Sequence, residues 1–149
     1  MPGRGLGLKA QLLVYPVTDA AGGYKSAGEN AKYPSRTQNA EGYFLTTDAM
    51  RFFAGQYLSA DGDGYDWRVS PLRAAGLKGL PPTVICTAEF DPLRDEADAY
   101  AGALRGAGVE VGHFREPGLI HGYFSLGAVS PAADAARLRA CAAFKQMLN

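Results

Sequence analysis

The sequence predicts an α/β fold built on about three parallel strands, and two observations lead to this prediction. Two short runs, 11–15 and 83–88, are largely apolar, as in strands that helices cover on both faces. From the second run onward, strand and helix patterns alternate along the chain, which is typical of a parallel sheet with helices on its faces. The length of 149 residues suits one domain with a single core.

The first predicted strand, 11–15, leads into a long irregular insert, residues 17–69. Pro16 ends this strand, because proline offers no N–H group to a strand ladder. A buried strand should have a neighbour on each side, yet the sequence offers only one candidate, so part of the sheet is expected to be missing. Residues 17–42 are rich in glycine, alanine, serine, asparagine and proline, and are expected to form loop.

One helix is predicted inside the insert, over residues 49–58. A threonine or aspartate within 46–48 is expected to cap its N-terminus. Met50, Phe53 and Tyr57 fall on one stripe of this helix, with Phe52 beside it. Core packing would explain these aromatic side chains, and a cap over a pocket is the alternative.

Residues 70–149, which we call the carboxyl-terminal half, hold the remaining predicted elements. The strand at 83–88 is followed by a helix over 92–105, a strand near 109–114 and a last helix over 131–148. The partial alternation of the strand near 109–114 indicates an edge strand. The apolar stripes of the two helices are Ala97, Tyr100, Ala101 and Leu104 in the first, and Ala136, Ala140, Phe144 and Met147 in the second.

Composition and charge argue against several classes of function. The chain is 47% hydrophobic and 20% charged, which indicates a globular protein. Fifteen basic residues balance fifteen acidic ones, so nothing points to nucleic acid or to an anionic membrane as a partner. No stretch approaches the ~20 apolar residues of a membrane span, and the N-terminus lacks the apolar core of a signal peptide. A cytoplasmic location is therefore expected.

Cysteines, histidines and clustered acids give weak signals for other chemistry. Cys86 and Cys141 lie in apolar sequence and are expected to be buried free thiols. Two histidines without ligand spacing, and no paired-cysteine motif, argue against a metal site. A further acidic cluster lies mostly along one helix face and is expected to be solvated; it consists of Asp91, Asp95, Glu96 and Asp98.

Two residues are candidates for catalysis because of where they fall. Asp91 follows a predicted buried strand and precedes Pro92, although taken alone an aspartate there is better explained as a helix cap. His121 lies in a predicted loop over 118–123, where local hydrogen bonds alone could also account for it. His113 lies inside a predicted strand and is interpreted as structural.

The order of the two candidates along the chain favours catalysis over these simpler explanations. An aspartate after one strand, then a helix, a further strand and a histidine in the next loop matches the Ser–Asp–His order of α/β-hydrolases. The carboxylate in that arrangement fixes the imidazole tautomer, and the imidazole moves a proton between serine and the leaving group.

Several motifs resemble those of the hormone-sensitive-lipase-like esterases, also called α/β-hydrolase fold-3. The run 80–96, LPPTVICTAEFDPLRDE, resembles the family's acid segment, and His121-Gly122-Tyr123 is similar to its histidine motif, with tyrosine where phenylalanine is usual. Shorter similarities are Tyr15-Pro16-Val17-Thr18-Asp19, Ser70-Pro71-Leu72 and Ala107-Gly108-Val109. The resemblance implies that Asp91 is the triad acid, that His121 is the triad base, and that no cofactor is needed. It also implies small ester substrates and a cap or lid over residues 17–69.

The family's nucleophile motif is not found in this sequence. The family carries a G-x-S-x-G elbow and an upstream His-Gly-Gly oxyanion segment before the strand that ends at Tyr15. The nearest imitation is Ser26-Ala27-Gly28, but position 24 is tyrosine where glycine is required, and Ser26 follows that strand. The chain is therefore expected to be the C-terminal portion of an esterase and to be nearly inactive alone. The alternative is a non-catalytic binding or assembly module that pairs, or self-associates, through an exposed sheet edge.

Overall fold

The computed structural model describes residues 7–60 and 62–149, and it confirms the predicted α/β architecture. Three parallel strands form one sheet in the order β1-β2-β3: β1 (Gln11–Val14), β2 (Thr83–Phe90) and β3 (Val111–Ile120). Five helices accompany them in the described part of the chain: α1 (Ala27–Asn30), α2 (Ser35–Gln38), α3 (Thr47–Tyr57), α4 (Arg94–Gly106) and α5 (Pro131–Met147). Short 3₁₀ turns lie at Ala21–Tyr24, Asp63–Tyr65, Pro71–Arg73 and Tyr123–Ser125.

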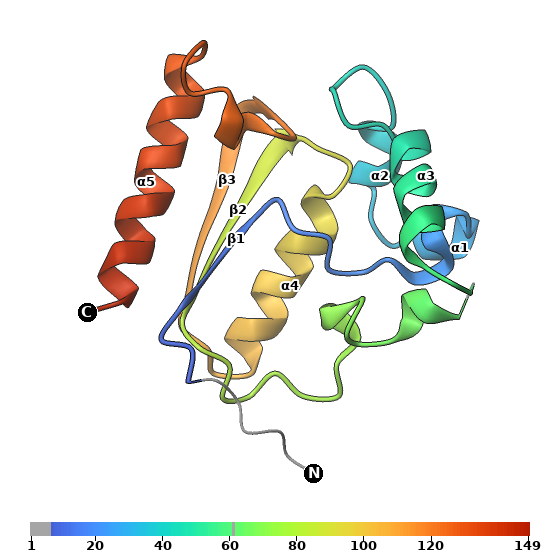
Figure 1. Ribbon diagram of the computed structural model, residues 1–149, viewed down its shortest axis with the longest axis horizontal. Coiled ribbons are helices and arrows are strands. Elements are labelled where there is room, and N and C mark those ends of the chain that lie inside the picture. Colours follow the sequence, from blue (N-terminus) through green and yellow to red (C-terminus); the bar gives the residue numbers. More distant parts are fainter. Residues whose placement is uncertain (1–6, 61) are drawn as a thin grey trace.

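Helices α4 and α5 cover opposite faces of the sheet (Figure 1). The alternation of side chains along β2 sends Val84 and Cys86 to the α5 side and Ile85 to the α4 side. Both predicted helix stripes are confirmed, because their residues pack in these two cores. Burial of apolar surface on both faces therefore makes β2 the centre of the fold.

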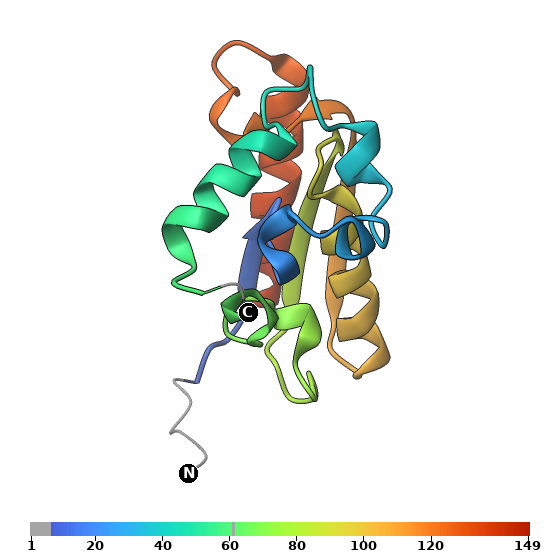
Figure 2. The same cartoon turned by 90° about the vertical axis from the view of Figure 1, so that its right-hand side faces the viewer.

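Strand β1 is an edge strand among the described residues, because it pairs only with β2. Gln11 lies opposite Thr83 and Val14 opposite Cys86, and all four residues of β1 are only partly buried. The single neighbour agrees with the sequence, which offered only one candidate to lie beside this strand. Figure 2 shows the outer side of β1 with α3 crossing above it.

Strand β3 is longer than predicted, because it continues through Pro117 to Ile120 and takes in residues expected to form loop. An irregularity near Ala88 shifts its register with β2, after which Phe90 lies opposite Ile120. The two strands therefore end side by side. The residue after each strand end then lies at the same edge of the sheet.

The insert differs from the sequence prediction in its first part. Residues 17–42 form two short helices and a 3₁₀ turn as well as loop, and these elements are too short to show a period. In α3, which Thr46 caps as expected, only Met50 of the predicted stripe is buried, whereas Phe53 and Tyr57 are 61% and 72% exposed. Most of this stripe therefore lies outside the core, and its residues line a pocket described below.

The structure also tests the predictions for the cysteines and for a membrane span. Both cysteines are free; Cys86 is buried as expected, but Cys141 is exposed on α5, so that prediction was wrong. None of the helices in the described ranges combines the length and apolarity that crossing a membrane requires.

Candidate active site

The structure brings Asp91 and His121 together at the carboxyl edge of the sheet. His121 Nδ1 lies 2.8 Å from Asp91 Oδ2. The Asp91 side chain is almost fully buried, whereas one fifth of the His121 side chain is exposed. The register of β2 and β3 explains why the two side chains are close. Phe90 and Ile120 are paired at the ends of these strands, and Asp91 and His121 directly follow them.

The second oxygen of Asp91 has a separate partner. Oδ1 accepts a hydrogen bond of 2.8 Å from the N–H of Leu93, the residue directly before α4 begins. The helix-start explanation of Asp91 is thus partly right, since the carboxylate does satisfy a backbone donor there. The two roles are compatible, because each uses a different oxygen.

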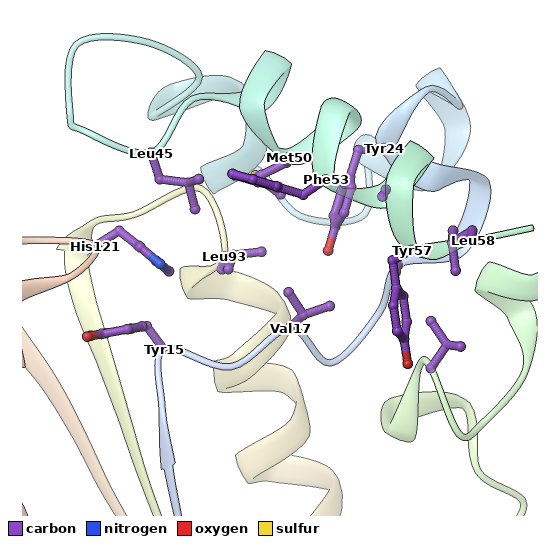
Figure 3. A pocket seen from close by; sticks show the side chains of 13 residues that line it. Tyr15, Val17, Tyr24, Leu45, Met50, Phe53, Tyr57, Leu58, Leu93 and His121 are labelled. Carbon is purple, nitrogen blue, oxygen red and sulfur yellow. The ribbon is translucent and has the colours of Figure 1, made fainter.

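The arrangement leaves one imidazole nitrogen free for chemistry. With Nδ1–H donated to the Asp91 carboxylate, the His121 Nε2 lone pair can accept a proton. Figure 3 shows the His121 ring pointing into a pocket, between Tyr15 and Leu45. Among the described residues, no serine hydroxyl is hydrogen-bonded to this ring. Ser26 instead caps α1 by accepting from the Glu29 N–H at 3.3 Å.

Tyr15 packs against the imidazole, a contact that the sequence did not predict. Its ring centroid lies 4.4 Å from that of His121 at an angle of 50°, and it also meets Tyr123 edge to face. Tyr15 has a positive φ of 38°, a backbone conformation that is rare for an aromatic residue. Burial and, to a smaller extent, the Asp91 charge raise the pKa of the Tyr15 phenol. The sequence signals were its place at the end of a predicted strand, directly before Pro16, and the similarity of the run Tyr15–Asp19 to the family.

A pocket of about 560 Å³ opens beside His121. The apolar side chains that line it come mainly from the insert and from the start of α4; they include Val17, Leu45, Met50, Phe53, Tyr57 and Leu93. Figure 3 shows Met50, Phe53 and Tyr57 of α3 pointing toward this pocket. The stripe of α3 therefore lines a pocket, and Met50 also belongs to a buried apolar cluster.

The acidic cluster is largely buried, which contradicts the solvated face expected from the sequence. Glu96 is fully buried and accepts hydrogen bonds from the backbone N–H groups of Thr18 and Asp19 at 2.8 and 3.1 Å. Its other oxygen lies 2.6 Å from Nη2 of Arg36, which is itself 1% exposed. These contacts join α4 to the insert, because charges removed from water require such partners.

His113 lies in the middle of β3, opposite Ile85, and not at the strand end that carries His121. Its Nε2 is 2.8 Å from Asp98 Oδ1, and Arg115 pairs with the other oxygen of the same carboxylate. The two histidines thus form two separate carboxylate pairs. Within the described ranges, no group of three or more histidine, cysteine, aspartate or glutamate side chains is arranged to hold a metal ion.

Sequence comparisons assign the chain to a family of known proteins. A sequence model of the alpha/beta hydrolase fold matches residues 2–125. Carboxylesterase NlhH of Mycobacterium tuberculosis is 39% identical over 143 residues, which cover 93% of this chain and 42% of that protein. An ethyl acetate hydrolase of Pseudomonas putida is 32% identical over 140 residues, which cover 94% of this chain and 41% of that protein.

Solved structures give the same result. A thermostable esterase from Pseudomonas putida ECU1011 superposes with a TM-score of 0.82 at 43% identity, over 95% of this chain and 43% of its own. EstE1, a carboxylesterase from a metagenomic library, superposes with a TM-score of 0.83 at 35% identity, over 95% of this chain and 46% of its own. The chain spans less than half the length of these relatives. It belongs to the hormone-sensitive-lipase-like, or α/β-hydrolase fold-3, family of carboxylesterases.

Proposed function

We propose that this chain supplies the acid and the base of a serine carboxylesterase, with Asp91 as the acid and His121 as the base. One observation carries the proposal: the 2.8 Å contact between His121 Nδ1 and a buried carboxylate, at the mouth of an apolar pocket. A carboxylate on Nδ1 holds the imidazole in the tautomer whose Nε2 can act as a base, and stabilises the imidazolium once it forms.

The proposed reaction proceeds in two steps. His121 Nε2 removes the proton from a serine hydroxyl as the serine oxygen attacks the ester carbonyl, and then delivers that proton to the departing alcohol. Water next attacks the acyl-serine. His121 takes the proton of this water and returns it to the serine oxygen as the acid leaves. Each bond formed is matched by one broken and the proton returns to the serine, so neither step needs an oxidant, a reductant or a cofactor.

The pocket supports small esters with apolar groups as substrates. Its lining is mostly aliphatic and aromatic, and its volume of about 560 Å³ suits acyl or alcohol groups of short to medium length. The relatives named as a carboxylesterase and an ethyl acetate hydrolase support the same substrate class.

The nucleophile in this proposal comes from a segment outside the 149 residues. Loss of triad members lowers turnover by factors of roughly 10⁴ to 10⁶, so this chain alone should hydrolyse esters poorly. One edge of β1 pairs with no strand among residues 7–60 and 62–149, and this supports the proposal, since a parallel strand bearing the serine could pair there and end near His121.

A chimeric protein tests the proposal. The part of the Mycobacterium tuberculosis carboxylesterase that this chain does not match is fused to it, and hydrolysis of p-nitrophenyl butyrate is measured. We expect turnover that falls by roughly 10³-fold or more in His121→Ala and that His113→Ala leaves unchanged. A folded, active chimera in which His121→Ala keeps full turnover would refute the assignment.

The free edge of β1 also favours a second candidate, a non-catalytic module that assembles with another copy of the chain. An unpaired strand edge offers N–H and C=O groups to a further strand. Mass measurement in solution separates the two candidates. A monomer at all concentrations excludes self-assembly. A stable dimer that the substitution Leu13→Pro converts to monomer would support it.

A further inference from the structure

The turn that carries Asp91 is hydrogen-bonded from the insert by the side chain of Asn39. This residue is 4% exposed and directly follows α2. Its Nδ2 amide donates to the carbonyl oxygens of Asp91 and Glu89, at 3.2 and 3.3 Å. Buried carbonyl groups need donors. Arg94 of α4 also donates to both, from its backbone N–H to the Asp91 carbonyl at 3.1 Å and from Nη1 to the Glu89 carbonyl at 2.9 Å, and Asn39 is the donor that the insert supplies to them.

Ser35, at the other end of α2, holds the next part of the same turn. Its hydroxyl donates to the Pro92 carbonyl at 2.9 Å and accepts from the Asp95 N–H at 3.1 Å. The Ser35 N–H in turn donates to the Asp95 carboxylate at 2.7 Å. Figure 1 shows α2 beside the turn between β2 and α4. The backbone on both sides of Asp91 is therefore fixed by α2.

The loop after α2 reaches the histidine turn as well. The Tyr43 ring stacks on Phe90 with centroids 4.8 Å apart. The next residue, Phe44, lies over Gly122. A Cβ atom added at Gly122 would lie 3.2 Å from the Phe44 ring. Gly122 directly follows His121 and has a φ of +83°, so glycine is required there for two reasons.

We propose that residues 35–44, which we call the clasp, position the Asp91–His121 pair, and that Asn39 is the main positioning residue. The clasp binds the backbone of the acid turn through hydrogen bonds and covers the histidine turn through Phe44. In this proposal Asn39 and Phe44 act through Asp91 and His121 and do not themselves contact the reacting atoms. The catalytic meaning of the pair rests on the proposed function, but the positioning is a property of this chain alone.

A purely structural role for Asn39 would be to close the end of α2. That role predicts a loss of stability without any change at His121. Positioning predicts a change in the imidazole itself, because the direction of the Asp91 carboxylate follows from the backbone that Asn39 holds. The imidazole tautomer therefore distinguishes the two roles.

The experiment measures the ring nitrogen chemical shifts of both histidines by NMR in this chain, at mildly alkaline pH where imidazoles are neutral. In the parent chain we expect His121 to carry its proton on Nδ1, next to Asp91, and His113 to carry its proton on Nε2, next to Asp98. In Asn39→Ala we expect His121 to become a mixture of tautomers and its Nδ1–H resonance to be lost. His113 should not change and serves as an internal reference for the fold.

Thr37→Ala is the matched control, because Thr37 lies in α2 and is exposed. An Asn39→Ala chain that is folded and keeps the His121 tautomer of the parent overturns the proposal. If Asn39→Ala does not fold, Phe44→Ala decides, because that side chain is 78% exposed and its removal leaves the core intact. A tautomer mixture in Phe44→Ala supports the clasp, and an unchanged His121 refutes it. Because no step measures esterase activity, failure here is distinct from failure of the chimera test.

Discussion

The insert and the carboxyl-terminal half are stabilised by different interactions. In the carboxyl-terminal half, β2 lies between two apolar cores, one under α4 and one under α5. In the insert, the apolar cluster is small, and buried charged side chains add the contacts that hold this region. Arg36, Glu96 and Asp19 are each at most 2% exposed and bond to one another or to backbone groups.

This difference matters for the site, because the site uses both regions. Strand ends of the carboxyl-terminal half place Asp91 and His121, and the insert supplies most of the pocket wall and the clasp. Apolar packing fixes where the strands end, while hydrogen bonds fix how the insert lies over them. Each region can therefore be weakened separately.

The largest effect is expected for Arg36→Ala in the insert. This change leaves the Glu96 carboxylate buried without its guanidinium, and breaking a buried pair from one side costs about 3–5 kcal/mol. Urea denaturation would measure the loss, and hydrogen exchange should show the insert opening first. Lys32→Ala is the control, because its exposed ion pair with Glu29 is worth about 0–1 kcal/mol. Equal losses in the two variants would show that the buried pair does not support the insert.

A smaller effect is expected for Ile85→Val in the apolar core under α4. Removing one buried methylene costs about 0.5–1.5 kcal/mol, and because β2 is central the whole chain should lose stability together. Val129→Ala, at an exposed loop position, should stay within about 0.5 kcal/mol of the parent. Hydrogen exchange that rises only in the insert of Ile85→Val would contradict the division between the regions.

Acid should weaken both regions. Burial alone would raise the pKa of Asp19, but hydrogen bonds from Arg73, Tyr33 and the Ala21 N–H outweigh it and lower that pKa. The pKa of Asp98 is likewise lowered, since His113 and Arg115 outweigh its burial. A carboxyl with a lowered folded-state pKa stabilises the fold above its unfolded pKa of about 4, and this contribution is lost as pH falls through the folded value.

Denaturation at a series of pH values below about 5 checks this expectation. Asp19→Asn and Asp98→Asn should each be less stable than the parent at neutral pH and should lose less stability in acid. A variant that keeps the full acid dependence of the parent would show that its carboxyl does not contribute.

The smallest effect is expected for Tyr24→Phe in the insert. The buried Tyr24 hydroxyl has no hydrogen-bond partner in the described part of the chain. Removing an unsatisfied hydroxyl should raise the unfolding free energy by up to about 1 kcal/mol. The control is Tyr100→Phe on α4, which should change stability little. A loss of stability in Tyr24→Phe would reveal a partner for this hydroxyl, such as bound water.

The sequence predicted the regions that apolar patterns describe. The pattern of apolar residues predicted the three strands and the stripes of α4 and α5, because burial follows a fixed period in a helix or a strand. The candidates Asp91 and His121 were predicted from their order along the chain and their places after strands. The stripe of α3 could not be assigned from its pattern alone, since residues that line a pocket have the same pattern as residues that face a core.

The insert could not be predicted because its contacts are polar and lie far apart in the sequence. Asn39 and Asp91 are separated by 52 residues, and Arg36 and Glu96 by 60. Neither pair follows a helical or strand period, and a buried glutamate looks in sequence like an exposed one. Only the folded chain shows that these side chains meet.

The most direct test of the central claim is the turnover of the chimera carrying Asp91→Asn. An asparagine fits the same space but cannot hold the imidazole in the tautomer that leaves Nε2 free, so we expect kcat for p-nitrophenyl butyrate to fall by roughly 10⁴-fold. Asp98→Asn, which removes the carboxylate beside His113, should leave kcat near that of the parent. A folded Asp91→Asn chimera with the kcat of the parent would contradict the account.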